Sequence, residues 1–145
     1  MAKFIYKMQN ILDIKYKLED QAKSQVAMAK QKLDEEESIL QGLYIKKEDY
    51  ENRLRGNIVT KLNIITIREL ENGIEIFKDK IVQQKREVEK ANKRYLAAMD
   101  NLKNIMIERK THEKLKENKF EEFVKEVNNE ENKEIDELVS FKYNS

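Results

Sequence analysis

Apolar residues recur every three or four positions along most of this 145-residue chain, and no proline interrupts the pattern. Such spacing places side chains on one face of an α-helix, whereas a half-buried strand needs alternation by two. Proline would break a helix and is common in loops, so its absence indicates long helices with few loops. We therefore expect long amphipathic helices rather than a sheet.

The charge balance narrows the functional classes. Charged residues make up 39% of the chain, yet the formal net charge is only +1, which gives no general attraction to nucleic acid or to an anionic membrane. Disorder of the whole chain is disfavoured because the apolar residues are periodic. There is no Cys, no apolar run approaches the ~20 residues of a membrane span, and the N-terminus lacks a signal-peptide core. These features predict an intracellular, cytoplasmic protein.

A first apolar seam extends over residues 4–54. Its positions are Phe4, Met8, Ile11, Lys15, Leu18, Ala22, Val26, Ala29, Leu33, Glu36, Leu40, Leu43, Lys47, Tyr50 and Leu54. Two successive steps of four around Ala22 break the alternation of three and four, so a stutter is expected there. The sequence RGN at 55–57 indicates a helix end with Gly56 in the left-handed cap position. The first helix is therefore predicted at about residues 3–55.

The stretch NIVTKLNIITIREL, residues 57–70, is rich in β-branched residues. It lies between the predicted helix end and a capping box formed by Thr66 and Glu69, and a lone strand would have no partner. A corner is therefore predicted at about 56–66. A second helix is predicted at about 67–140, with a frayed tail. Its seam is Leu70, Ile74, Phe77, Ile81, Gln84, Val88, Ala91, Tyr95, Ala98, Leu102 and Ile105, then Arg109 and His112, and in a shifted register Leu115, Phe120, Phe123 and Val127.

Two long helices joined by a short corner pack as antiparallel neighbours. The predicted fold is all-α: a single domain over residues 1–145 that forms an elongated, antiparallel two-helix coiled-coil hairpin. Some apolar residues are not needed for the seam, and these favour contact with other proteins, a widened seam or an intermolecular coiled coil, alternatives that the sequence leaves open. They are Tyr6, Ile14, Ile39, Tyr44, Ile45, Ile76, Met99, Met106, Ile107, Val124 and Phe141.

The sequence contains no motif that indicates catalysis. His112 is the one histidine, and a general base needs an oriented partner and a pocket. The acidic residues 34–37 point around a helix axis and cannot converge on one cation. The basic run 103–119 could contact nucleic acid, but Glu108, Glu113 and Glu117 can pair with its lysines at helical spacing. We therefore expect no catalytic residue, no cofactor, no metal and no nucleic-acid partner.

Four stretches resemble the FliJ family of flagellar export proteins, in the same order and over nearly the whole chain. They are FIYKMQNILDIKYKLEDQAK, KEDYENRLRGN, RELENGIEIFKDKI and ENKEIDELVSFKY. The resemblance implies a non-enzymatic coiled-coil component of the flagellar type III secretion apparatus. It also implies a fold similar to the central stalk (gamma) subunit of rotary ATPases. A generic structural or self-associating coiled-coil scaffold is the alternative, and it would sediment as a dimer or larger species.

The resemblance implies partners as well. Family members bind the hexameric export ATPase, promote its assembly and ATP hydrolysis, and link it to the cytoplasmic part of the membrane export gate and to export chaperones. A monomer is implied, held peripherally at the inner face of the membrane through its partners. The gate contact matches Leu43, Tyr50 and Phe77, which also fit the seam. The ATPase contact matches residues 4–25 and 110–126, in particular Phe4, Met8, Ile11, Leu18, Leu115, Phe120 and Phe123.

Overall fold

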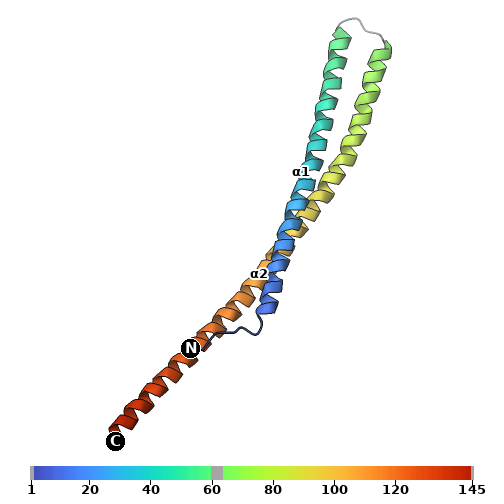
Figure 1. The fold of residues 1–145 in the computed structure, drawn as a ribbon. Coiled ribbons are helices and arrows are strands. Elements are labelled where there is room, and N and C mark those ends of the chain that lie inside the picture. The colour runs from blue at the N-terminus through green and yellow to red at the C-terminus, as the bar shows by residue number, and fades with distance from the viewer. Residues whose placement is uncertain (1, 60–63, 145) are drawn as a thin grey trace. The chain divides into compact units, whose positions relative to one another are not determined.

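A computed structural model describes residues 2–59 and 64–144. It contains helix α1, Gln9–Val59, and helix α2, Ile64–Asn144, and no strand within these residues (Figure 1). The chain divides into two compact units. We call Ala22–Asn101 the hairpin unit, and Met1–Gln21 with Leu102–Ser145 the terminal unit. In each unit a segment of α1 packs against a segment of α2, and the predicted all-α antiparallel coiled coil is confirmed.

The first helix begins at Gln9 rather than near residue 3. Residues 2–8, which we call the N-terminal arm, form no helix, and the backbone N–H of Gln9 donates to the Tyr6 carbonyl at 3.1 Å. The physical reason lies in the terminal unit, where the Phe4 ring packs 5.3 Å from the Phe120 ring of α2. The arm leaves the helical path for this aromatic contact.

The two helices also approach the corner more closely than predicted. Helix α1 continues through Gly56 to Val59, and the backbone of Gly56 is helical rather than left-handed. Helix α2 begins at Ile64, two residues before Thr66, so Thr66 does not cap it. A glycine inside a helix costs only about 1 kcal/mol, and β-branched residues lower helix propensity only slightly. The rest of the predicted corner, residues 60–63, lies outside the described residues.

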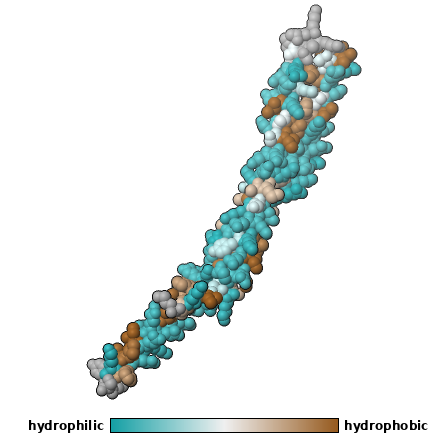
Figure 2. All heavy atoms as spheres, viewed as in Figure 1, coloured by the Kyte–Doolittle hydropathy of each residue, from teal (hydrophilic) through white to brown (hydrophobic). Residues whose placement is uncertain are grey.

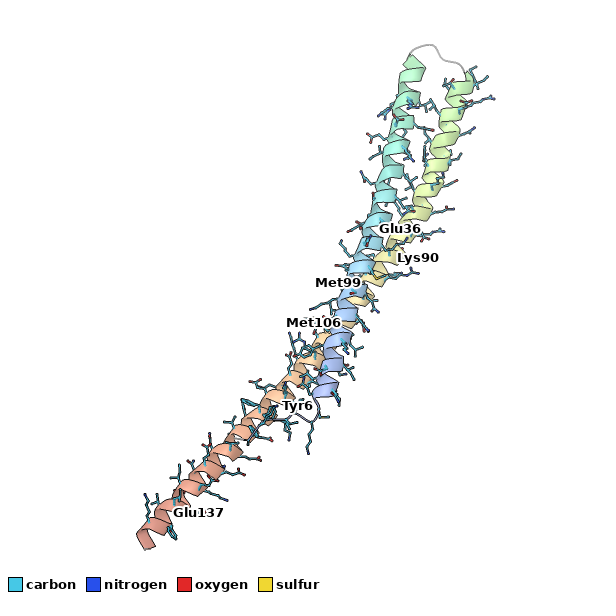
Figure 3. All side chains as sticks on the ribbon, in the orientation of Figure 1. Tyr6, Glu36, Lys90, Met99, Met106 and Glu137 are labelled. Carbon is cyan, nitrogen blue, oxygen red and sulfur yellow. The ribbon has the colours of Figure 1, made fainter. Side chains whose placement is uncertain are left out.

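The core of the hairpin unit follows the predicted seams. Its buried apolar residues are Ala22, Leu33, Leu70, Ile74, Ile81 and Ala91. Glu36, labelled in Figure 3, is buried among them. Gln84 of α2 donates from Nε2 to the Glu36 carbonyl at 2.9 Å and to its carboxylate, and Lys32 forms an ion pair with Glu36 at 2.9 Å. The Lys32 and Gln84 hydrogen bonds hold the pKa of Glu36 below its ordinary value. The predicted α2 seam through this unit is confirmed.

The seam of the terminal unit differs from the prediction. Leu12 and Glu19 are buried, at 2% and 5% exposure, whereas Ile11 and Leu18 are exposed at 38% and 37%. Positions 12, 15, 19 and 22 keep the alternation of three and four that continues at Val26, so there is no stutter at Ala22. The prediction followed hydrophobicity and was wrong because Glu19 pairs with Arg109 of α2 and can therefore occupy a seam position.

A close approach of the helices depends on Gly73. A Cβ atom at this position would overlap Cε2 of Tyr50 and lie 2.7 Å from Cδ2, and the Tyr50 ring in turn packs edge-on against Phe77 at 5.0 Å. Glycine is thus needed on α2 because the aromatic ring of α1 lies directly over its backbone.

Two glycine substitutions test this packing. Gly42→Ala should stabilise the hairpin unit by about 1 kcal/mol, because helix propensity improves and an added Cβ meets nothing within 4 Å. Gly73→Ala gains the same propensity but displaces the Tyr50 ring, so we expect a net loss of stability. Urea denaturation followed by circular dichroism measures both. Equal stabilisation by the two substitutions would show that the Tyr50 ring moves without cost.

Candidate partner-binding surfaces

An aromatic cluster joins the N-terminal arm to α2 in the terminal unit. The Phe4 ring lies 5.3 Å from Phe120, 5.4 Å from Phe123 and 6.5 Å from Tyr6. Figure 3 shows Tyr6 lying toward α2, and the Tyr6 hydroxyl is buried with no hydrogen-bond partner among the described residues. The arm and α2 together line a groove of about 550 Å³. Phe4, Phe120 and Phe123 are thus brought together as one surface.

The other residues predicted for the ATPase contact lie in the same unit but outside its core. Met8, in the N-terminal arm, is 46% exposed. Ile11 and Leu18 of α1 are 38% and 37% exposed, and Leu115 of α2 is 46% exposed. Leu12 and Glu19 take the seam positions, so these side chains lie beside the seam and stay partly exposed. They remain available for contact with another protein.

A polar network crosses the seam of the terminal unit. Arg109 donates from Nε and Nη2 to the two Glu19 oxygens, at 2.7 and 3.1 Å, and from Nη1 to Glu113 at 3.1 Å. The Tyr16 hydroxyl donates to Glu113. The Tyr16 bond, with Arg109 beside it, lowers the pKa of Glu113, and the bond to Glu19 raises the pKa of Arg109. Lys15 pairs with Glu108 at 3.0 Å. The network joins helices rather than forming a reactive site.

The residues predicted for the gate contact lie in the hairpin unit and only partly at its surface. Tyr50 and Phe77 are half-buried against each other. Leu43 is half-buried and lines a groove of about 490 Å³ together with Ile39 and Lys80. Leu43 thus lies at a surface groove, whereas Tyr50 and Phe77 contribute to the packing of the helices.

Most of the apolar residues outside the predicted seams are exposed. Figure 2 shows apolar side chains among hydrophilic ones on both helices. Those more than a third exposed are Ile14, Ile39, Tyr44, Ile45, Ile76, Met99, Ile107, Val124 and Phe141, whereas Tyr6 and Met106 are half-buried. A widened seam would bury these residues, so their exposure favours contact with another chain, either a different protein or a second copy.

The polar clusters noted in the sequence have structural partners. In the acidic run 34–37, Asp34 pairs with Lys30 at 3.2 Å, whereas Glu36 is buried in the seam. The carboxylates of the run therefore diverge. Within the described residues, no three acidic or histidine side chains could hold a metal ion. His112 is half-buried, and its Nδ1 atom has no hydrogen-bond partner among those residues. A general base needs such an orienting partner.

The basic run 103–119 forms ion pairs at helical spacing. Arg109 pairs with Glu113 at the predicted spacing of four residues, at 3.1 Å, whereas Lys114 pairs with Glu117 at a spacing of three, at 3.5 Å. Glu108 instead pairs with Lys15 of α1. Lys119 pairs with Glu122 at 3.4 Å. Several of these charges are thus engaged within the chain.

The last part of α2 is helical, whereas a frayed tail was predicted there. The helix continues to Asn144, and residues 128–142, which we call the tail helix, are all exposed. Ile135, Leu138 and Val139 are 56%, 63% and 51% exposed. Sequence reasoning missed these three residues because many acidic residues surround them, although their spacing of three and four positions is the signal that could have found them.

These features define the class of protein. Two amphipathic helices pair along a seam and expose apolar side chains, as expected of a coiled-coil protein that works by contact with others. The model of the family described as "Flagellar FliJ protein" matches residues 4–145. The chain therefore belongs to the FliJ family of flagellar export proteins, and the resemblance found in the sequence is confirmed.

The fold has a counterpart among solved structures. It is similar to a structure described as that of a YscO homologue, CT670, from Chlamydia trachomatis, with 20% identity, a TM-score of 0.58, and 97% of this chain and 96% of that chain covered. At this identity the likeness concerns the fold alone. A search of curated proteins found no match. None of the helices in the described part of the chain is long and apolar enough to cross a membrane.

Proposed function

We propose that this protein is the stalk and adaptor of the flagellar export apparatus. It binds the hexameric export ATPase, promotes assembly of the ring and ATP hydrolysis, and links the ATPase to the cytoplasmic part of the membrane export gate and to export chaperones. It acts as a monomer and reaches the membrane only through these partners. Family membership supports this proposal.

One observation carries the ATPase contact. Met8, Ile11 and Leu18 are exposed because the seam passes through Leu12 and Glu19 instead. Had they formed the seam, they would have been hidden from any partner. Together with Leu115 and the aromatic cluster of Phe4, Phe120 and Phe123, they give the terminal unit an apolar surface suited to a protein contact.

The proposed mechanism needs no chemistry from this chain. ATP hydrolysis supplies the free energy at the ATPase's own sites. A rod that contacts the inner wall of a ring unequally binds some subunit conformations better than others, and it shifts their populations by that difference in affinity. The gate contact is proposed at Leu43 and its groove, with Tyr50 and Phe77 shaping the helix surface around it.

A phosphate-release assay with the purified export ATPase tests the proposal. The wild-type chain should stimulate hydrolysis. The double variant Ile11→Asp/Leu18→Asp should raise the concentration needed for half-maximal stimulation at least about tenfold, because two charged groups would have to be desolvated at the contact. Both residues are exposed, so circular dichroism should show an unchanged fold.

The matched control is Met28→Asp/Ile45→Asp, which changes two exposed apolar residues of the hairpin unit. It should stimulate the ATPase as the wild type does. Absence of any stimulation by the wild-type chain would contradict the proposed function. Equal loss in both double variants would show that the contact is not confined to the terminal unit.

A further inference from the structure

The N-terminal arm, residues 2–8, is not helical, although its sequence contains neither Gly nor Pro. Figure 1 shows the arm leaving the start of α1 and running to α2 within the terminal unit. Burial alternates along it, because Phe4 and Tyr6 are half-buried whereas Ile5 between them is 75% exposed. Such alternation is typical of an extended chain. The arm therefore packs against α2 through every second side chain and forgoes the hydrogen bonds of a helix.

The observed seam of α1, continued toward the N-terminus, falls on two apolar residues of the arm. The seam positions 12, 15, 19 and 22 are separated by three, four and three residues, so the next positions back are Met8 and Ile5. Both side chains are exposed in the arm, at 46% and 75%. A helix that began near residue 2 would bring both of them onto the face that α1 turns to α2.

In such a helix, Met8 and Ile5 would meet the same part of α2 that holds the arm in the structure. Glu19 lies opposite Arg109, and in an antiparallel pair each step back along α1 matches one step forward along α2. Met8 lies 11 positions before Glu19 and Ile5 lies 14 before it, which brings them to the level of residues 120 and 123. Both of these α2 residues are phenylalanines, so an apolar packing is available to a helical arm.

Each of the two packings leaves something unsatisfied. In the observed one the Phe4 ring lies 5.3 Å from Phe120 and 5.4 Å from Phe123, a favourable aromatic contact. The Tyr6 hydroxyl, however, is buried with no hydrogen-bond partner among the described residues, and a groove of about 550 Å³ lies between the arm and α2. A helix would bond its own backbone and turn Tyr6 to the side of the seam, where water reaches the hydroxyl, but it would lose the Phe4 contacts. These terms oppose one another.

We propose that the N-terminal arm is a two-state switch. In the docked state, which the structure contains, Phe4 and Tyr6 pack on α2 while Ile5 and Met8 face solvent. In the helical state α1 begins near residue 2, and the two pairs of side chains exchange places. The switch thus replaces one apolar surface by another at the same site, and any protein that binds one of them better shifts the arm to that state. The switch is a property of the chain alone, so its test needs no export ATPase.

The Cα chemical shifts of residues 2–8, measured by NMR on the full-length chain, report the state of the arm, because helical and extended backbones shift this resonance in opposite directions. Phe4→Ala should raise the ratio of helical to docked arm at least about tenfold, since it removes the docked ring and leaves the seam positions intact. Ile5→Lys should lower this ratio. Ile5 is exposed in the docked state, whereas a lysine at the seam position of the helical state would have to be desolvated.

The double variant Phe4→Ala/Ile5→Lys is the control, because it damages both packings and should give the arm the shifts of a coil. The resonances of the hairpin unit should match those of the wild type in all three variants. Coil shifts or unchanged shifts in Phe4→Ala alone would overturn the switch, since the arm would then lack a helical packing or would not be held by Phe4. Release of the docked arm by Ile5→Lys would overturn it as well, because Ile5 would then belong to the docked packing.

Discussion

Replacing Ile81 with alanine is expected to destabilise the hairpin unit by about 3 kcal/mol. Ile81 is 6% exposed, and removing its side chain deletes buried methyl and methylene groups and leaves a cavity between the helices. A coiled coil buries one stripe per helix, so each seam residue contributes a large share of the total stability. Urea denaturation followed by circular dichroism measures the loss.

The adjacent Val82 provides the control. It lies on the same helix but is 52% exposed, so Val82→Ala should change the free energy of unfolding by no more than about 0.5 kcal/mol. Both substitutions are made in the same helix and change its helix propensity by nearly the same amount. The difference between their effects on the free energy of unfolding therefore reports the burial of Ile81. A loss of similar size at both positions would mean that the seam does not run through Ile81.

Arg109→Leu is expected to destabilise the terminal unit strongly, whereas Glu19→Leu/Arg109→Leu should be at least as stable as the wild type. The single change leaves the buried Glu19 carboxylate without the two hydrogen bonds from Arg109. The double change fills both positions with apolar side chains, which commonly replace a buried ion pair without loss. Urea midpoints of the wild type, both single variants and the double variant complete a double-mutant cycle.

Acid titration gives an independent check of the same network. The pKa of Glu113 lies below its ordinary value of 4.5, first because the Tyr16 hydroxyl donates to it and then because Arg109 lies beside it. Because the pKa of Glu113 is lower in the folded state, its ionised carboxylate stabilises the fold at pH values above the ordinary pKa. This stabilisation is lost as the pH falls from the ordinary pKa through the folded-state pKa. Tyr16→Phe should therefore reduce the acid sensitivity of the terminal unit. An unchanged acid transition would remove Tyr16 from the network.

The two polar pairs of the seam also specify which helix surfaces meet. Glu19 requires Arg109, and Glu36 requires Gln84, on the opposite helix at the same level. A shift of register would bury at least one of these groups without its partner, at a cost in free energy. The two pairs therefore favour this register of the helices over others.

Sequence periodicity alone determined the helical class, the hairpin and the α2 seam from Leu70 to His112. These depend on local spacing, because a helix repeats every 3.6 residues wherever it occurs. Some exposed apolar residues, such as Ile39 and Phe141, were also identified from the sequence, since they fall outside the predicted seams. The exposed Ile11 and Leu18 were instead placed in the seam, and Leu138 was missed. Whether they stay exposed depends on the packing of the two helices.

The tertiary structure decided the register of α1 before Ala22, the N-terminal arm and the extent of both helices around the corner. Hydrophobicity favoured Leu18 for the seam, but Glu19 occupies it because Arg109 lies opposite, 90 positions away. The arm leaves the helix because Phe4 reaches Phe120. The register and the arm each depend on a partner distant in the chain. Local preferences cannot report such a partner, because its free-energy contribution exists only after the helices have paired.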